Sequence, residues 1–435
     1  MDLVSFLGTF ITPVMLFLSS AAVLSEVDFR KILSPRRFFR TLADLPEKQR
    51  SSPLRSLSLA LAGTLGVGNI TGVCSAIIMG GPGAVFWMWI GAVAVLPVKY
   101  AETFLAVKYR RKSADGYLGG AFFYIRDGFS GGAFPSVLGG IFAVLCCLNS
   151  LITGNIVQSN AAACVFGADR RLYCGIALGV LLLAAVIAGV KRTDKITAAV
   201  IPPLCAVYLL IGLYIILSNL NEIPAVFGEI FSSAFGFRAL GGGVFGISVK
   251  TAIRYGVMRG IFSNEAGCGT SPTAHASAET KSPHHQACYG IVEVVFDTLV
   301  LCTVTALVLL IADRKYGILP YGMNVDVSPI TLGAFTSLTG NAVYYILLVS
   351  VFLFAYSTLI AQYYYGIAAV NYLTDKKIPR VIYSCLSIGC AVLGSVISAP
   401  VMWTLADLII GIMTAVNCAV VIMLRRRLTR SPSEK

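Results

Sequence analysis

The chain has 435 residues, of which 57% are hydrophobic and only 13% are charged. A soluble protein carries roughly 25% charged residues, so this composition predicts a multi-pass membrane protein and excludes a disordered one. The net charge of +13 does not indicate a nucleic-acid partner, because the Lys and Arg residues stand in connections between hydrophobic runs.

A window of roughly 19 residues finds about eleven hydrophobic runs long enough to cross a bilayer, which predicts an all-α polytopic membrane protein. The predicted spans are residues 4–24, 56–79, 84–107, 139–166, 172–189, 196–217, 244–276, 287–312, 342–372, 381–397 and 401–424. The Lys- and Arg-rich connections all fall on one side if the N-terminus is outside. We therefore predict a cell-membrane protein with its N-terminus outside and its C-terminus in the cytoplasm.

The first predicted span and the connection after it have their own features. Met1 and Asp2 precede the span, which lacks the basic segment of a signal peptide, so we expect the span to be retained. Residues 29–45 mix Phe, Leu and Arg at helical spacing. They either lie on the cytoplasmic membrane surface or form an ordinary solvated connection.

Two spans are too rich in glycine and polar residues to stay helical throughout. The second reads AGTLGVGNITG over residues 62–72, and the seventh reads RGIFSNEAGCGTSP over residues 259–272. Gly costs about 1 kcal/mol of helix propensity relative to Ala, and unwound backbone at membrane depth must line a cavity or be buried in protein. Such breaks in two halves of a chain are typical of a transporter's binding site, although small residues also serve close helix packing.

The spacing of the breaks predicts an internal repeat. Each broken span is the first of a unit of about five spans. Because five is an odd number of crossings, the second unit has the opposite orientation in the membrane to the first. The predicted organisation is an extra N-terminal transmembrane helix with a basic cytoplasmic connection (1–55), a first five-helix repeat (56–219), an extracellular connection (220–243), a second five-helix repeat (244–424) and a basic cytoplasmic tail (425–435).

Four motifs resemble those of the alanine or glycine:cation symporter family, the sodium:alanine symporters. They are GTLGVGNI at 63–70, GGPGAVFWMW at 80–89, KYAE at 99–102 and RGIFSNEAG at 259–267. The resemblance runs from about residue 56 to residue 373. It implies a leucine-transporter-type core that moves small neutral amino acids with sodium by alternating access, in a lipid bilayer and without an enzymatic cofactor.

The resemblance also implies the binding residues. A buried zwitterion needs donors for its carboxylate and acceptors for its ammonium group, and sodium needs about five or six oxygens. The expected substrate-binding residues are Thr64, Gly68 and Asn69 at the first break, Ser263, Asn264 and Gly267 at the second, and Gln158. The expected sodium ligands are the hydroxyls of Ser357 and Thr358 and the carbonyls of Ala62 and Leu65. For Gln158, and for the Ser-Thr pair, the alternative is a contact between helices.

Gln362 departs from the family pattern, which usually places Trp at this position. If that Trp walls the pocket, Gln362 makes the pocket larger and more polar, so that serine, asparagine or glutamine is accepted. In the alternative interpretation Gln362 points elsewhere.

Several ionisable residues lie within the predicted spans. Some of them are expected to form ion pairs, and the others leave both sodium and the proton as candidate coupling ions. Lys99 and Glu102 are three residues apart and are expected to pair on one helix face. Arg259 and Glu265 are expected to form a structural ion pair or a helix cap, or else a gate or a proton-linked element. No partner is predicted for Asp297 and Asp407, so proton coupling stays an alternative to sodium.

The remaining residues give no sign of an enzyme. His275, His284 and His285 have no carboxylate or thiolate at the spacing of metal ligands, and they are expected in a cytoplasmic loop. A disulfide between Cys164 and Cys174 is weakly indicated. No nucleophile and base constellation and no phosphate loop occurs in the sequence. The alternatives to a sodium symporter are a proton-coupled amino-acid transporter, a channel, and a membrane amino-acid sensor that does not transport.

Overall fold

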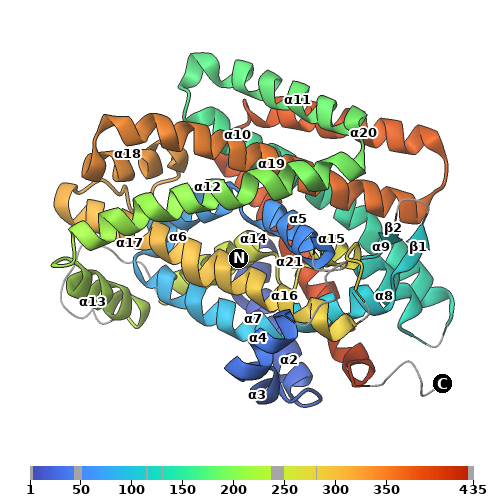
Figure 1. Cartoon of the computed structure of the whole chain (residues 1–435). Helices are drawn as coiled ribbons and strands as arrows, with labels where there is room; N and C mark the ends of the chain where they lie inside the picture. Colours follow the sequence, from blue (N-terminus) through green and yellow to red (C-terminus); the bar gives the residue numbers. More distant parts are fainter. Residues whose placement is uncertain are drawn as a thin grey trace.

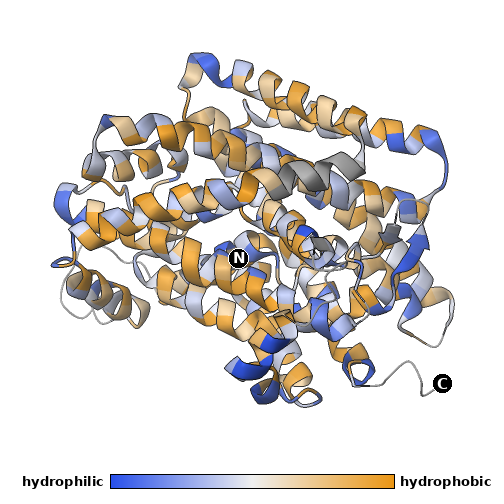
Figure 2. Cartoon of the chain, in the orientation of Figure 1, coloured by the Kyte–Doolittle hydropathy of each residue, from blue (hydrophilic) through white to orange (hydrophobic). Residues whose placement is uncertain are grey.

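The hydrophobic runs fold into long helices that surround two interrupted helices near the middle of the bundle (Figure 1). The computed structural model describes residues 3–43, 51–113, 116–129, 131–236, 249–280 and 282–429, without the side chains of 51 and 190–198. Hydrophobic residues run along the helices, while hydrophilic residues gather at helix ends and in connections such as those around α3, α4 and the β-hairpin (Figure 2).

The helical elements follow one another with short connections. In the first half they are α1 (Leu3–Phe6), η1 (Leu7–Ile11), α2 (Thr12–Leu24), α3 (Phe29–Ile32), α4 (Pro35–Ala43), α5 (Ser51–Thr64), η3 (Val67–Asn69), α6 (Thr71–Gly80), α7 (Gly83–Lys108), α8 (Ala121–Asp127), α9 (Ala133–Asn149), η4 (Ser150–Ile156), α10 (Val157–Cys164), η5 (Ala168–Arg170), α11 (Arg171–Ala188) and α12 (Val190–Ser218). In the second half they are α13 (Ile223–Ala234), α14 (Val249–Asn264), α15 (Pro272–Ala276), α16 (Pro283–Val294), η7 (Val295–Cys302), α17 (Thr303–Tyr316), α18 (Val327–Thr339), α19 (Asn341–Leu373), α20 (Lys377–Gly394), α21 (Ala399–Leu424) and η8 (Arg425–Arg427). Strands β1 (Arg111–Ser113) and β2 (Gly116–Leu118) form an antiparallel hairpin in which Arg111 lies opposite Leu118.

Within the described residues, nine helical stretches are long and apolar enough to cross a membrane. The pair α5 and α6 makes a tenth if it is one broken span. The predicted count of about eleven is therefore not confirmed. The remaining candidate, 244–276, contains α14, which has 16 residues and carries Lys250, Arg254 and Arg259; residues 244–248 lie outside the described residues.

Two helices lie in segments that the sequence analysis predicts as connections. Helix α13 lies in the predicted extracellular connection, and it buries Val226, Ile230 and Ala234, which share one face at a spacing of four residues. Helix α18 lies between the predicted spans 287–312 and 342–372. In the segment 29–45, residues 29–32 and 35–43 form the helices α3 and α4, and 44–45 lie outside the described residues. The location of this segment on the membrane surface stays a prediction.

The predictions for the histidines and the disulfide were wrong. His275 is fully buried in α15, with its Nε2 2.7 Å from Glu293 Oε2, because α15 packs inside the bundle. His284 and His285 lie in the first turn of α16, where His284 Nδ1 is 2.8 Å from the Tyr100 hydroxyl. Cys164 and Cys174 are free thiols.

Candidate functional site

The first break lies where the glycine-rich motif predicted it. Helix α5 ends at Thr64, a single 3₁₀ turn follows from Val67, and α5 and α6 are bent by 57°. The break leaves the Val67 N–H without a partner in its own helix, and this group donates to Gln158 Oε1 at 2.9 Å. Gln158 thus stabilises the unwound backbone.

Gly66 is required in this break by the close approach of two side chains. A Cβ at Gly66 would lie 2.5 Å from both Gln158 Oε1 and Thr358 Oγ1. The sequence thus brings the backbone of the first break against α10 and α19, which supply those two side chains.

Gly66→Ala is accordingly expected to displace Gln158 and Thr358 and so to weaken binding at the substrate and sodium sites that the family resemblance implies. Overpacking costs about 1–3 kcal/mol, so we expect half-maximal uptake to need about tenfold more sodium. Sodium titration of uptake in membrane vesicles measures this shift. Gly140→Ala is the matched control because nothing lies within 4 Å of a Cβ there, and equal behaviour of the two variants would contradict the expectation.

The second break is a tight turn between α14 and α15. It contains three residues with positive φ: Glu265 at 52°, Gly267 at 81° and Gly269 at 79°. The two glycines adopt this conformation without strain, whereas Glu265 is the exception among the described non-glycine residues. Its carboxylate accepts hydrogen bonds from the Thr270 hydroxyl at 2.8 Å and from Gln362 Nε2.

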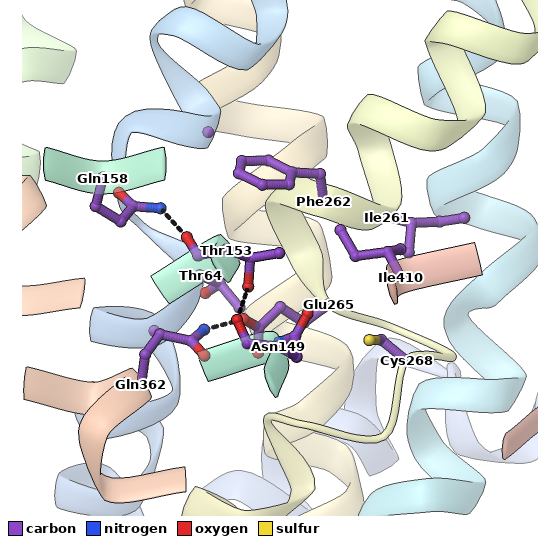
Figure 3. A pocket seen from close by; sticks show the side chains of 12 residues that line it. Thr64, Asn149, Thr153, Gln158, Ile261, Phe262, Glu265, Cys268, Gln362 and Ile410 are labelled. Carbon is purple, nitrogen blue, oxygen red and sulfur yellow. Dashed lines mark hydrogen bonds between the residues drawn. The ribbon is translucent and has the colours of Figure 1, made fainter. Parts of the chain in front are cut away.

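A pocket lies between the two breaks (Figure 3). Its lining residues are Gly63, Thr64, Gly68, Asn149, Thr153, Gln158, Ile261, Phe262, Glu265, Cys268, Gln362 and Ile410. The free space is about 10 Å³, which is at the lower limit for one water molecule. The described conformation is therefore closed, with polar side chains filling the space.

Four of the predicted substrate-binding residues line this pocket: Thr64, Gly68, Gln158 and Gln362. Gln362 reaches into the space and donates to Glu265, while its Oε1 is buried without a hydrogen-bond partner (Figure 3). The π-helical segment η4 ends just before α10 and supplies Thr153, whose carbonyl accepts from Gln158 Nε2 at 3.3 Å. Such segments are frequent at functional sites.

The other four predicted substrate-binding residues lie beside the pocket. Asn69 Nδ2 and Ser263 Oγ donate to the two carboxylate oxygens of Asp297 at 2.7 and 2.8 Å. Asn264 Nδ2 donates to Thr298 Oγ1 at 3.0 Å. The Gly267 N–H donates to Glu102 at 3.3 Å.

Asp297 is fully buried and receives hydrogen bonds from neutral groups, the third being the Thr298 hydroxyl at 2.8 Å. Within the parts of the chain that the structure describes, no Lys, Arg or His forms an ion pair with it. The Asn69 Oδ1 atom is also buried without a hydrogen-bond partner. Asp297 therefore brings an uncompensated carboxylate between the two breaks, which the sequence alone did not assign to any site.

The expected sodium ligands are partly assembled. The Thr358 hydroxyl donates a hydrogen bond to the Ala62 carbonyl oxygen at 2.9 Å, so α19 and the end of α5 meet here. The Ser357 hydroxyl donates to the Phe354 carbonyl within α19 at 2.9 Å. Leu65 lies in the break, with its N–H bonded to the Leu61 carbonyl at 2.5 Å.

The predicted pair of Lys99 with Glu102 was wrong, and the ion-pair alternative for Arg259 and Glu265 is excluded, because charges on neighbouring helices compensate each other instead. Lys99 pairs with Glu293 on α16, Nζ to Oε1 at 3.0 Å, rather than with Glu102. Arg259 pairs with Asp407 on α21 and stacks on Trp403, with 4.0 Å from the guanidinium carbon to the ring centroid. The turn at Glu265 directs its carboxylate to Gln362 and Thr270.

Sequence reasoning missed several pocket residues: Asn149, Thr153, Ile261, Phe262, Cys268 and Ile410, with Glu265 considered only as an ion-pair or gate residue. The polar run from Asn149 to Gln158 carries a signal for the first two. Ile410 carries none, because an isoleucine in a hydrophobic span is unremarkable until the fold places it.

The sequence model of the sodium:alanine symporter family matches residues 4–433. The sodium/alanine symporter AgcS of Methanococcus maripaludis is 38% identical over 371 residues, which cover 84% of this chain and 80% of AgcS. The probable sodium/glutamine symporter GlnT of Bacillus subtilis is 34% identical over 393 residues, which cover 90% of this chain and 80% of GlnT.

A solved structure confirms the predicted fold class. The crystal structure of MhsT in complex with L-phenylalanine matches with a TM-score of 0.57, covering 86% of this chain and 87% of that chain. The sequence identity is 14%, so this likeness concerns the leucine-transporter-type fold alone.

Proposed function

The chain belongs to the sodium:alanine symporter family, and from this premise we propose that it moves small neutral amino acids together with sodium. It is a secondary transporter of amino acids and not an enzyme. The observation that carries sodium coupling is the approach of Thr358 Oγ1 to the Ala62 carbonyl oxygen at 2.9 Å. Hydroxyl and carbonyl oxygens are ligands for hard cations, and these two belong to different helices.

Sodium at this place would be held by Thr358 and Ala62, with Ser357 and the Leu65 carbonyl completing the proposed ligands. A cation bridging α19 and the first break would favour the conformation in which the two are close. Binding and release of sodium would therefore change the position of α19 relative to the first break. Alternating access requires such a link between ion binding and helix movement.

Asp297 supports a second cation position. A buried carboxylate among neutral donors is costly unless its charge is compensated. The Asp297 oxygens, the unpartnered Asn69 Oδ1 and the hydroxyl of Ser263 together offer hard oxygen ligands. Asp297 also favours the second candidate function, proton-coupled transport, because a proton would compensate the same charge.

The central pocket is the proposed amino-acid site. Thr64 and the backbone near Gly68 offer donors to the substrate carboxylate, and the Glu265 carboxylate offers an acceptor to its ammonium group. The pocket must open to admit a substrate, because about 10 Å³ is free in the closed conformation. Rocking of one helix group against the other would supply that opening.

We also propose that polar amino acids are accepted. Gln362 lines the pocket and leaves one buried amide oxygen unpartnered. The substrate's polar side chain could satisfy that oxygen. The similar protein GlnT of Bacillus subtilis is described as a probable sodium/glutamine symporter, which agrees with this proposal.

Gln362→Trp is expected to shift selectivity toward alanine and glycine, because the indole removes space and the amide's hydrogen bonds. Competition of unlabelled serine, asparagine and glutamine against labelled alanine uptake measures the shift. Gln362→Met is the matched variant, since it keeps a similar length but removes the polarity. An unchanged competition profile in Gln362→Trp would show that Gln362 does not set selectivity.

The orientation in the membrane is inferred from the Lys- and Arg-rich connections, which are expected on the cytoplasmic side. We propose a cell-membrane protein whose N-terminus is outside and whose C-terminus is cytoplasmic. Its proposed units are the 1–55 helix and connection, the inverted repeats 56–219 and 244–424, the 220–243 connection and the 425–435 tail. Reaction of single introduced cysteines with a membrane-impermeant reagent would test the orientation.

The coupling of substrate binding to sodium is tested with the purified protein by comparing alanine binding in sodium chloride and in potassium chloride. We expect alanine to raise the melting temperature in sodium chloride and to have little effect in potassium chloride, because the two ligands stabilise the same closed conformation. Equal stabilisation in both salts, together with a dependence on pH, would favour proton coupling instead.

A further inference from the structure

Lys99 is fully buried in α7, and its ammonium group contacts the second break at both ends. Nζ donates to the Asn264 carbonyl at 3.1 Å and to the Ser271 hydroxyl. Asn264 is the last residue of α14, and Ser271 immediately precedes α15. One side chain therefore joins the two halves of the broken helix.

A second residue of α7 holds the middle of the same turn. Glu102, three residues after Lys99, accepts the Gly267 N–H at 3.3 Å. Asn417 of α21 donates to Glu102 at 2.9 Å and to the Gly267 carbonyl at 2.9 Å. The turn is thus held at its start, middle and end by groups on helices that are not broken.

Lys99 is itself fixed by a buried network. Glu293 Oε1 is 3.0 Å from Lys99 Nζ, and Glu293 Oε2 is 2.7 Å from His275 Nε2 in α15. The other ring nitrogen of His275 lies 2.8 Å from Gln286 Nε2. All four side chains are fully buried, so the ammonium group has little freedom to leave the turn.

The turn that Lys99 spans contains Glu265, whose φ of 52° is uncommon for a residue with a side chain. Strained conformations of this kind persist when their surroundings hold them in place. In this conformation the Glu265 carboxylate reaches the pocket and meets Gln362. The contacts of Lys99 with Asn264 and Ser271 bracket the strained residue.

We propose that Lys99 is a positioning residue. It keeps the backbone of the second break in its unwound conformation and keeps the Glu265 carboxylate directed into the amino-acid pocket. The inference rests on the proposed function, because the pocket is where the substrate is taken to bind. Lys99 acts through the Asn264 carbonyl and the Ser271 hydroxyl, and Glu293 serves to neutralise and orient it.

The competing explanation is that Lys99 merely neutralises Glu293. The double variant Lys99→Met with Glu293→Gln separates the two explanations, because it removes both charges together. The amide oxygen of the glutamine can still accept a hydrogen bond from His275 Nε2, so that contact is kept. If neutralisation were the whole role, this variant would behave as the wild type. If Lys99 positions the turn, the Asn264 carbonyl and Ser271 hydroxyl lose their common donor in this variant.

Hydrogen exchange of residues 264–275 in the purified full-length protein measures the turn directly, without depending on transport. We expect faster exchange in the double variant than in the wild type. In the same preparations we expect the KM for alanine uptake to rise by about tenfold, the effect expected when a hydrogen bond from a charged group is lost. The matched control removes the half-exposed Arg171 and Asp326 pair by Arg171→Met with Asp326→Asn, and its exchange at 264–275 should be unchanged.

Unchanged exchange in a folded double variant would overturn the proposal. If the double variant does not fold, Ser271→Ala carries the test, because it removes one contact of Lys99 and no charge. It should speed exchange at 264–275, whereas Ser350→Ala, whose hydroxyl donates to the Ile346 carbonyl within α19, should not; equal exchange in both would overturn the proposal. Failure of the wild type to transport would contradict the proposed function and leave the exchange result to decide the role of Lys99.

Discussion

Asp297→Asn is expected to abolish sodium-driven accumulation of amino acid while leaving the protein folded. The substitution keeps the size of the side chain and removes its buried charge. Two unit charges 4 Å apart attract by about 4 kcal/mol at an effective dielectric constant of 20, so losing the carboxylate should weaken cation binding by about 100-fold or more. Uptake of labelled alanine at increasing sodium concentration measures the loss.

The control for this experiment is Asp375→Asn, because Asp375 is an exposed carboxylate in the connection between α19 and α20. It should transport as the wild type does. The melting temperature measured without ligand shows whether the variant is still folded, and so distinguishes loss of cation binding from loss of the fold. Wild-type sodium dependence in a folded Asp297→Asn protein would remove the second cation position from the mechanism.

Thr358→Val should raise the sodium concentration needed for half-maximal uptake by about tenfold, the effect expected when one neutral oxygen ligand worth roughly 1.4 kcal/mol is lost. Valine has nearly the shape of threonine, so the packing of the fully buried side chain is kept. The affinity for alanine at saturating sodium should change much less. Initial uptake rates over a matrix of sodium and alanine concentrations distinguish the two effects.

Thr358→Ser retains the hydroxyl and should stay close to the wild type, which makes it the matched control. Ser357→Ala asks whether its neighbour is also a ligand, since the Ser357 hydroxyl is bonded within α19 in the closed conformation. If Thr358→Val keeps the wild-type sodium dependence, the cation does not lie between α19 and the first break.

The breaks were predictable because their causes are local. Gly63, Gly66 and Gly68 weaken the first helix in the sequence itself, and the polar run at 263–271 does the same for the second. The family resemblance also implied Thr64, Gly68 and Gln158, and the departure from the family pattern singled out Gln362; all four line the pocket. Local backbone preference and a motif resemblance are therefore enough to find the two halves of the candidate site.

The charge partners were not predictable, because they depend on which helices become neighbours. Arg259 and Asp407 are 148 residues apart, and Lys99 lies 165 residues from the Asn264 carbonyl that it contacts. The spacing rule for one helix face therefore chose Glu102 as the partner of Lys99, whereas packing supplied Glu293. The same limit applies to Asp297: its charge within a hydrophobic span is visible in the sequence, but its partners Asn69 and Ser263 are not.

Uptake by liposomes that contain the purified protein tests the central claim most directly. Labelled alanine, glycine, serine, asparagine and glutamine would each be offered with an inward sodium gradient, with an inward proton gradient and with no gradient. The proposed function predicts accumulation above equilibrium that requires the sodium gradient and is selective among the five. Accumulation driven by the proton gradient alone, or uptake of none of the five under any gradient, would contradict it.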